Sequence, residues 1–277
     1  MSKVTAAVGV DVGGSGIKAA VVDIATGQLT SERLRIPTPT PSTPELVSAA
    51  ISRLVRRLNK ASNLPSDAPV GVGLPGVAME GRLLTAANID PTWVDYPVAE
   101  KLTAALKRPV SIVNDADAAG IAEMRFGIGA GEPGVVIFLT LGTGVGSGVF
   151  VDGILVPNTE FGQMEIRGRP AERRSAAAAR VRRGLSWKAW AADLDEHLER
   201  IEDIMWPKLL ILGGGVSKNA DRFIPRLHRR APVVAAALRN DAGIIGAAIV
   251  AAEGLADAAT TFDDLPDATR AKVTARG

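Results

Sequence analysis

The start of the chain alternates short apolar runs with glycine turns. Residues 6–12 are a continuous run of small and β-branched residues, a pattern that predicts a buried strand. The Gly-Gly-Ser-Gly segment at 13–16 predicts a tight turn, and strands are expected over 17–23 and 28–36. No helix fits between these strands, so the pattern predicts a β-meander. It excludes a Rossmann dinucleotide site, because that site needs a helix directly after its glycine turn.

Longer apolar patterns predict the rest of the first half. An amphipathic helix is expected to begin near Thr43 or Pro44, since apolar residues then recur every four positions. Residues 70–74 and 110–113 predict two more buried strands, and 116–126 predicts a helix. Helices that alternate with buried strands are typical of an α/β domain.

The second half repeats the opening order of strand, glycine turn and strand. The expected elements are strands over 134–141, 145–151 and 208–212, a hairpin turn at Asp152-Gly153, and helices over 186–205, from about Ser217, and over 241–252. Two such halves predict an α/β protein of two domains with a cleft between them. We expect a first domain over 1–113 and a second over 114–277, with the helix near 241–252 packing back on the first domain.

Composition narrows the class of protein. The 277 residues are 47% hydrophobic and 22% charged, which is typical of a globular chain. Lys and Arg number 32 against 30 Asp and Glu, so the charge balance does not indicate a nucleic-acid partner. The lack of cysteine excludes disulfides, thiolate metal sites and a cysteine nucleophile. No apolar run approaches the roughly 20 residues that span a bilayer, and the chain does not start with a secretory pattern. We therefore expect a cytoplasmic protein with no membrane partner.

Three glycine-rich turns, each after a buried strand, are candidate phosphate sites. They lie at 13–16, 142–144 and 213–215. Glycine lets backbone N–H groups surround an anion, because no Cβ stands in the way. Lys18 and Ser15 would add donors, and Asp11 could hold Mg²⁺ through water. The alternative is that each turn only closes a hairpin.

A carboxylate follows the strand at 110–113. Asn114 and Asp115 lie at the carboxyl edge of the predicted sheet, where α/β folds bind ligands. Phosphoryl transfer to a hydroxyl needs a carboxylate that accepts the hydroxyl proton, and Asp115 is the candidate base. Asp is also a favoured N-cap and a helix follows, so the cap and base roles can be shared among Asn114, Asp115 and Asp117 in several ways.

These segments resemble the motifs of a known family, the ROK sugar kinases (repressor, open reading frame, kinase). The segments that carry the resemblance are 11–18, 114–120 and 141–146. Three more segments, 85–90, 151–160 and 213–218, resemble the polyphosphate glucokinases of actinobacteria, a branch that includes the polyphosphate/ATP glucomannokinases. The resemblance runs from about Val8 to Ala252. It implies the two-domain actin-like ATPase (ribonuclease H-like) fold with an interdomain cleft.

The resemblance implies a role for each matching residue. Asp115 is similar to the base that takes the proton of the sugar 6-hydroxyl. The residues expected to bind the sugar are Asn88, Asn114, Asp115, Glu160, Gln163 and Glu172. The residues expected to bind the phosphoryl donor are Asp11, Gly13, Gly14, Ser15, Gly16, Lys18, Thr140, Gly142, Thr143, Gly144, Gly214 and Gly215.

The implied activity is that of a polyphosphate-dependent glucokinase, which phosphorylates the 6-hydroxyl of glucose from inorganic polyphosphate and from ATP. The alternative is an ATP-dependent hexose kinase of the same family with altered sugar preference. We expect Mg²⁺ as cofactor, no zinc, and a homodimer. Gln163 departs from the family, whose Glu-x-Gly-His motif has His at that position. Gln donates and accepts hydrogen bonds, so sugar binding can survive the change while affinity or sugar preference shifts.

Two other classes of protein agree less well with the sequence. A ROK-type repressor would need a DNA-binding helix-turn-helix before the first strand, which here starts about six residues into the chain. A sugar-binding protein without turnover is suggested only by Gln163, and Asp115 argues against it.

Two basic groups have two interpretations each. One group spans Arg167 to Arg183, and the other comprises Lys218, Arg222, Arg226, Arg229 and Arg230. Each group can be a solvated helix face, or it can extend the donor groove for polyphosphate, a polyanion whose binding weakens with salt. His197 and His228 are the only histidines, and both are expected in helical segments as surface or packing residues.

Overall fold

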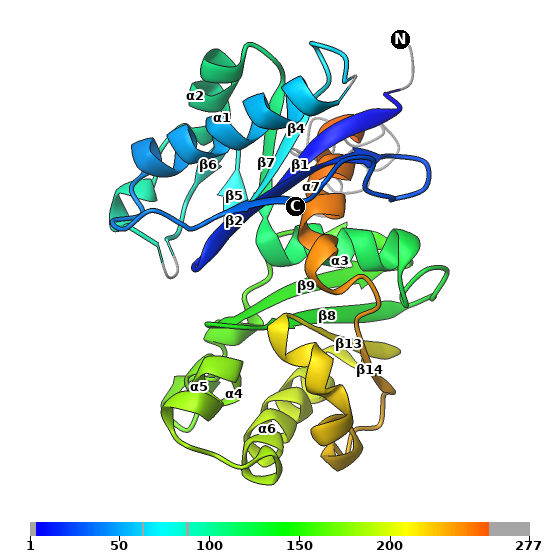
Figure 1. Cartoon of the computed structure of the whole chain (residues 1–277). Coiled ribbons are helices and arrows are strands. Elements are labelled where there is room, and N and C mark those ends of the chain that lie inside the picture. Colours follow the sequence, from blue (N-terminus) through cyan, green and yellow to red (C-terminus); the bar gives the residue numbers. More distant parts are fainter. Residues whose placement is uncertain (1–3, 63, 87–88, 255–277) are drawn as a thin grey trace, which may run out of the picture.

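Two five-stranded sheets, one in each lobe, form the framework of the molecule (Figure 1). The computed structural model describes residues 4–62, 64–86 and 89–254. The first sheet has the order β3-β2-β1-β4-β7. Its strands are β1 (Ala6–Gly13), β2 (Gly16–Asp23), β3 (Leu34–Ile36), β4 (Val70–Leu74) and β7 (Val110–Asn114). β1, β2 and β3 are antiparallel, whereas β4 and β7 add on parallel to β1, which confirms the predicted meander.

The second sheet has the same plan, with the order β10-β9-β8-β13-β14. Its strands are β8 (Val135–Leu141), β9 (Val145–Val151), β10 (Ile154–Val156), β13 (Leu209–Gly213) and β14 (Val233–Ala235). β8, β9 and β10 are antiparallel, and β13 and β14 add on parallel to β8. The predicted hairpin turn is confirmed, because Asp152 and Gly153 both have positive φ, 50° and 80°.

The predicted strand over 28–36 is wrong in its first part. Only Leu34–Ile36 forms a strand, and Leu29 makes an isolated bridge to Val22. The side chain of Ser31 accepts a hydrogen bond from the backbone N–H of Val21, at 2.9 Å. A hydroxyl that takes a strand's N–H replaces the ladder bond that a continuous third strand would make.

Helices cover both faces of each sheet. The longer ones are α1 (Pro44–Ala61), α2 (Val98–Leu106), α3 (Asp115–Phe126), α6 (Trp187–Met205) and α7 (Ala242–Glu253). The short elements are β5 (Ala78–Met79), β6 (Arg82–Leu83), η1 (Pro91–Trp93), η2 (Phe161–Gln163), β11 (Glu165–Ile166), β12 (Arg169–Pro170), α4 (Glu172–Ser175), α5 (Ala177–Arg182), η3 (Gly215–Arg222), η4 (Ile224–Arg226) and η5 (Arg239–Asp241). No described helix is long and apolar enough to cross a membrane.

Two of the helix predictions need correction. The segment expected to be helical from Ser217 is 3₁₀, and non-helical dihedral angles at Asn219 interrupt it. His228 follows η4 in an irregular segment and not in a helix, whereas His197 is fully buried in α6, as a packing residue.

The side-chain alternation of β1 explains how the first sheet is covered. Val8, Val10 and Val12 face α1 in one core. Ala7 faces the other way, toward α7, in a core that also contains residues of the second sheet. Large apolar side chains thus fill one face, and small residues on the other face leave room for a helix.

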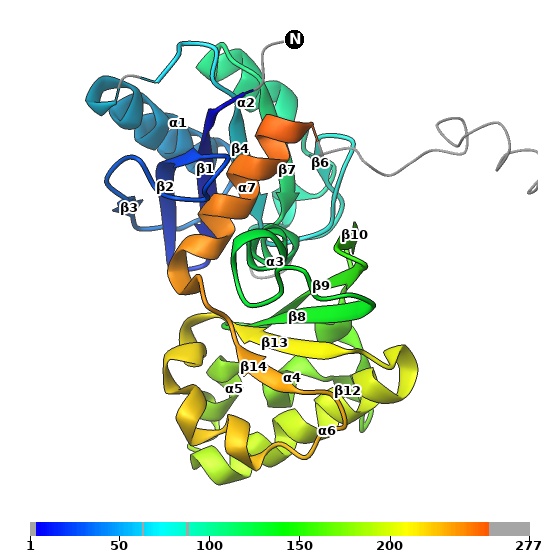
Figure 2. The same ribbon diagram turned by 90° about the vertical axis from the view of Figure 1, so that its right-hand side faces the viewer.

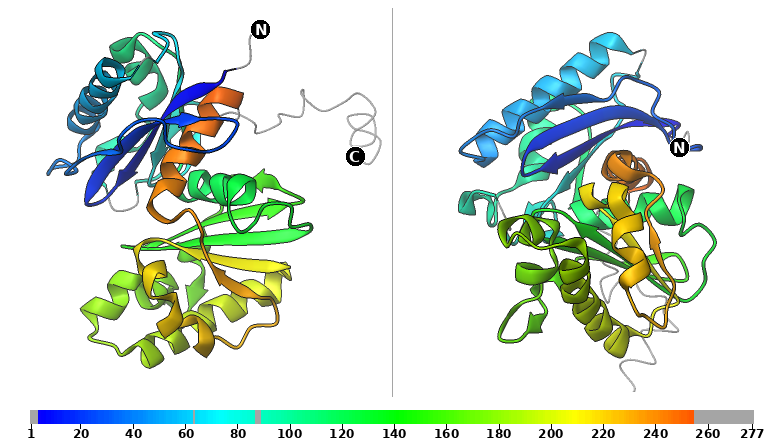
Figure 3. Two further views of the ribbon diagram at one scale, coloured as in Figure 1. Left: turned by 45° about the vertical axis from the view of Figure 1, so that its right-hand side comes forward. Right: turned by 60° about the horizontal axis from the view of Figure 1, so that its bottom comes forward.

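α7 lies directly against the first sheet, although it comes from the end of the described chain. α3 and α7 lie between the two sheets (Figures 2 and 3, green and orange). Three glycines allow the close approach: an added Cβ would lie 1.8 Å from the carbonyl oxygen of Ile244 at Gly9, 1.7 Å from that of Ala247 at Gly71, and 1.6 Å from that of Ala118 at Gly246. The division of the chain into 1–113 and 114–277 stays a prediction.

Candidate active site

A cleft of about 280 Å³ is lined by residues from both lobes. Most of the residues expected to bind sugar or donor lie around it: Asp11, Gly13, Gly14, Lys18, Asn114, Asp115, Thr140, Gly142, Thr143, Gly144, Glu160, Gln163, Glu172, Gly214 and Gly215. Asn88 lies outside the described residues. The structure does not bring Ser15 and Gly16 to the cleft. Gly16 lies against the guanidinium of Arg35, which donates to the carbonyl of Ser15 at 3.0 Å.

The first two glycine turns face each other across one end of the cleft. A Cβ added at Gly14 would lie 4.0 Å from Oγ1 of Thr143, although the two residues belong to different lobes. The hydroxyl of Thr140 accepts from the N–H of Gly146 at 3.2 Å. Gly214 has a positive φ of 81°, and a Cβ added there would lie 2.6 Å from the carbonyl oxygen of Leu141, so both the conformation and the space favour glycine. The three turns therefore enclose one space, as an anion site built from backbone N–H groups requires.

The structure assigns the N-cap of α3 to Asn114. Its Oδ1 accepts from the N–H groups of Ala116 and Asp117, at 2.8 and 3.0 Å, and its Nδ2 donates to the carbonyl of Gly76 in the first lobe, at 3.1 Å. Asp115 is thus free of the capping role. It follows at the first helical position and lines the cleft.

Burial and like charges keep the carboxyl group of Asp115 protonated up to an unusually high pH. Desolvation is the largest cause, the charge of Asp11 is the next, and those of Glu160 and Asp117 add to it. The N–H of Ala116 acts in the opposite direction. The result is a pKa of about 7, far above the ordinary value of 3.8. A carboxylate poised near neutral pH is suited to accept a proton during a reaction.

Lys18 and Asp11 form an ion pair in the cleft, beside the turn at 13–14. The Lys18 Nζ lies 2.8 Å from Oδ2 of Asp11, and β1 and β2 place the two residues opposite each other. A Cβ added at Gly243 of α7 would lie 3.1 Å from the carboxyl carbon of Asp11. α7, at the end of the described chain, therefore packs against the part of the site that β1 forms.

Two acidic side chains, Glu160 and Glu172, form what we call the acidic end of the cleft. Gln163 donates from Nε2 to Oε1 of Glu172 at 3.2 Å, and Oε2 of Glu172 accepts from the N–H of Val145 at 3.1 Å. Glu160 lies nearby, and its pKa is raised by burial and by the charge of Glu172. Gln163, at the position where the family motif has His, therefore orients Glu172 through a hydrogen bond that it donates.

A buried histidine, His197, packs beneath the backbone of this acidic end and holds it through hydrogen bonds. His197 contacts the carbonyl of Phe161 through Nε2 at 3.0 Å and the hydroxyl of Ser175 through Nδ1 at 2.9 Å. A carbonyl can only accept, so Nε2 carries the hydrogen. Burial lowers the pKa of His197. No local pattern indicates this role, because α6 meets η2 and α4 only in the folded chain.

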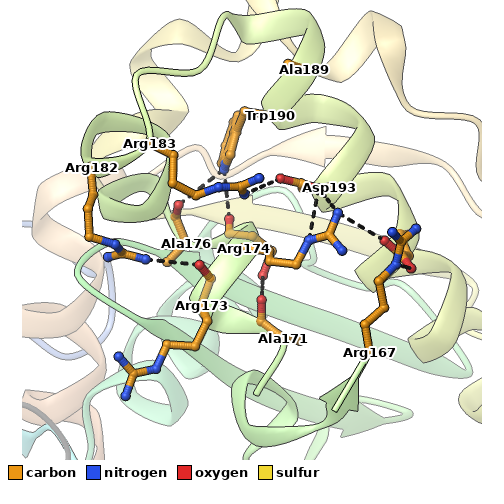
Figure 4. A network of polar contacts seen from close by, with 12 residues as sticks. Arg167, Ala171, Arg173, Arg174, Ala176, Arg182, Arg183, Ala189, Trp190 and Asp193 are labelled. Atoms are coloured by element: carbon orange, nitrogen blue, oxygen red, sulfur yellow. Dashed lines mark hydrogen bonds and ion pairs between the residues drawn. The ribbon is translucent and has the colours of Figure 1, made fainter. Parts of the chain in front are cut away.

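Five of the eleven arginines in the two basic groups have acidic partners outside the cleft. In the first group, Arg174 and Arg183 pair with Asp193 of α6, and Arg167 pairs with Glu196 (Figure 4). In the second group, Arg229 and Arg230 pair with acids of the same helix. None of these arginines lines the cleft. The charges of these five arginines are offset within the second lobe, whereas the hypothesis that other residues of the two groups extend the donor groove stays a prediction.

Several residues that line the cleft escaped the sequence analysis. They are Pro75, Gly76, Val145, Gly146, Arg239, Asn240 and Gly243. Pro75 and Gly76 end a predicted buried strand, and this position was the signal that could have identified them. Arg239 and Asn240 precede α7 and reach the cleft because that helix packs on the first lobe. Buried Glu123 holds the preceding loop, as it accepts from the N–H groups of Ala237 and Leu238 at 3.1 and 2.6 Å.

A second, larger cavity of about 860 Å³ lies beside α3. Its lining is mostly apolar, and of the predicted site residues that the structure describes only Asn114 lies on its wall. The chemistry described above belongs to the smaller cleft.

The two-lobed fold and the cleft between its glycine turns define a sugar kinase of the actin-like ATPase architecture, and the chain belongs to the ROK family, whose model matches residues 7–165. The polyphosphate glucokinase of Mycobacterium tuberculosis is 45% identical over 242 residues, which cover 87% of this chain and 89% of that protein. The crystal structure of the inorganic polyphosphate/ATP-glucomannokinase of Arthrobacter sp. strain KM superposes with a TM-score of 0.86 at 48% identity, covering 88% of this chain and 97% of that one. A ROK family glucokinase from Streptomyces griseus, in complex with glucose and AMPPNP, gives a TM-score of 0.79 at 27% identity, covering 90% and 100%.

Proposed function

We propose that this protein is a polyphosphate-dependent glucokinase, which transfers a phosphoryl group from inorganic polyphosphate, and from ATP, to the 6-hydroxyl of glucose. The observation that carries the proposal is the position of Asp115. Its carboxylate lines a cleft between facing glycine turns and a group of acidic side chains, with a pKa of about 7. The relatives that are 45% and 48% identical are named for the same activity.

The acceptor would bind at the acidic end. Glu160 and Glu172 accept hydrogen bonds from sugar hydroxyls, and Asn114 and Gln163 orient the group around them. Asp115 takes the proton of the 6-hydroxyl as the oxygen of that hydroxyl attacks the terminal phosphorus of the donor. The bond from that phosphorus to the rest of the donor breaks as the new O–P bond forms, and the shortened polyphosphate or ADP leaves.

The donor would bind at the glycine end. Backbone N–H groups of the turns at 13–14 and 142–144 surround the transferred phosphate, and Lys18 adds a positive charge. The donor set fits Mg²⁺, because this ion keeps several waters and takes its other ligands from one or two carboxylates and from substrate phosphates. Asp11 is the carboxylate that would hold it through water. When bound, Mg²⁺ neutralises the charge of the transferred phosphate.

We expect Arg239, an exposed cation that lines the cleft, to contact a long polyanion more than it contacts ATP. It is exposed at the edge of the cleft, beside the turn at 213–215. We expect Arg239→Ala to raise the KM for polyphosphate about 5-fold more than the KM for ATP, and to reduce the slope of log KM against log salt by about 0.7. Arg53→Ala, at an exposed arginine of α1 outside the cleft, is the control. Equal effects on both donors would rule out this role for Arg239.

The proposed activity is tested by measuring glucose 6-phosphate with purified protein, Mg²⁺ and each donor separately. Product from polyphosphate supports the proposal, and product from ATP alone supports the ATP-dependent alternative. Replacing glucose by mannose tests the sugar preference that Gln163 leaves open. The homodimer and the cytoplasmic location stay predictions, and light scattering of the purified protein checks the first of them.

A further inference from the structure

The side chain of Asn158 joins the two lobes on the wall of the larger cavity, two residues before Glu160 of the cleft. Its Oδ1 accepts from the N–H of Ala78 at 2.9 Å, and its Nδ2 donates to the carbonyl of Ala78 at 3.0 Å. Ala78 belongs to β5 in the first lobe, whereas Asn158 lies between β10 and η2 in the second. One amide side chain thus satisfies both backbone groups of one residue, as a neighbouring strand would.

The backbone of Asn158 is fixed at the same time. Its N–H donates to Oδ2 of Asp117 at 2.7 Å, and Asp117 is buried in the first turn of α3, two residues after Asp115. Asn158 has a φ of 59°, in the left-handed region that asparagine tolerates better than most residues. These contacts link α3, the segment before η2 and the first lobe into one network.

Asn158 lies two residues before Glu160, so the network fixes the backbone next to Glu160. On its other side the segment is held by Ser147 of β9, whose hydroxyl donates to the carbonyl of Thr159 at 2.7 Å and accepts from the N–H of Phe161 at 3.0 Å. Within the described residues the carboxylate of Glu160 has no hydrogen-bond partner. Its position therefore depends on the backbone that Asn158 and Ser147 hold.

The first lobe contributes a matching contact. Ala78 lies two residues after Gly76, whose carbonyl accepts from the Asn114 side chain at 3.1 Å. Asn114 and Asn158 thus fasten the second lobe to neighbouring points of one segment of the first. The first contact lies beside Asp115 and the second beside Glu160.

We propose that Asn158 is a positioning residue for glucose, an inference that rests on the proposed function. Its bonds to Ala78 position Glu160 at the sugar site and link that site to the first lobe. The bonds bury little apolar surface, so their loss should alter sugar binding more than stability. Asn158 bonds to Ala78 and Asp117 and to no residue of the donor turns, so donor binding should change little.

The test is Asn158→Gly, because glycine adopts the left-handed conformation and removes only the side-chain bonds. Two lost hydrogen bonds predict a rise of about 10-fold in the Kd for glucose by calorimetry and in its KM. The KM for polyphosphate should change less than about 2-fold, and Tm by no more than a few degrees. The matched control is Asp152→Gly, another residue with positive φ, whose side chain accepts from the N–H of Gly134 far from the cleft. It should leave the Kd for glucose unchanged.

A second variant guards against a folding defect in the first. Asn158→Asp keeps the acceptor for the N–H of Ala78 and loses the donor to its carbonyl, so it should also raise the Kd for glucose, by about 3-fold or more. An unchanged Kd in the folded variants, or equal losses toward glucose and polyphosphate, would overturn the positioning role. If the wild-type protein itself binds no glucose, the proposed function fails first, and the two failures are distinguished by that measurement.

Discussion

Asp115→Asn is expected to lower kcat for glucose phosphorylation by about 10²–10⁴-fold while the Kd for glucose changes little. Asn has nearly the same shape, so the sugar still binds, but its amide cannot accept the proton of the 6-hydroxyl. The measurement pairs a glucose 6-phosphate assay with calorimetry of glucose binding. Asp152→Asn, an exposed Asp-to-Asn change on the β9–β10 hairpin, is the control and should retain full activity. Full turnover in the Asp115 variant would exclude it as the base.

The same carboxylate predicts a pH dependence. The reaction needs Asp115 ionised, and its pKa is about 7, so kcat/KM should fall about 10-fold per unit as the pH drops below 7. The folded protein holds this proton between about pH 4 and 7, whereas the unfolded chain does not, so Asp115 makes the fold more stable as the pH falls through 7. Asp115→Asn lacks this contribution. The Tm of the wild type minus the Tm of Asp115→Asn should therefore increase from pH 8 to pH 6. A difference that stays constant would contradict the raised pKa.

Gly71→Ala is expected to destabilise the fold by about 3 kcal/mol or more, or to prevent folding. The added methyl carbon would lie 1.7 Å from the carbonyl oxygen of Ala247. The backbone sets the positions of both atoms, so neither atom can move unless β4 or α7 moves. α7 would have to move off the first sheet, which would also open the core that it shares with the second.

The control for this prediction is Gly215→Ala, since a Cβ there meets no atom within 4 Å. Its free energy of unfolding should stay within about 1 kcal/mol of the wild type. Urea unfolding of the three proteins provides the comparison. An unchanged midpoint in Gly71→Ala would mean that α7 does not lie against β4 as described.

Local patterns were sufficient to predict the strands and the turns that end them. The glycine turns at 13–16 and 142–144 and the Asn114-Asp115 pair stand at strand ends, and the carboxyl ends of parallel strands meet at one edge of a sheet. Most of the cleft could therefore be predicted before any tertiary contact was known. The strand over 28–36 failed for a local reason, the competing hydroxyl of Ser31.

The remaining parts of the site depend on contacts between distant segments. Arg239 and Gly243 reach the cleft only because α7 packs on the first lobe, through small residues whose partners no periodicity reveals. His197 supports the sugar end from a helix that is distant in sequence. Three of the seven arginines between 167 and 183 pair with acids of α6, which follow later in the chain. Charge counted along the sequence does not show which charges neutralise each other.

The central claim is that one cleft brings the glucose 6-hydroxyl, Asp115 and the terminal phosphate of polyphosphate together for direct transfer. Phosphorus NMR of the purified protein with glucose, Mg²⁺ and polyphosphate follows every product at once. The account predicts that a glucose 6-phosphate signal grows while free orthophosphate stays low, and that Asp115→Asn abolishes this growth. Release of orthophosphate without glucose 6-phosphate, or no reaction with either polyphosphate or ATP while glucose binds, would contradict it.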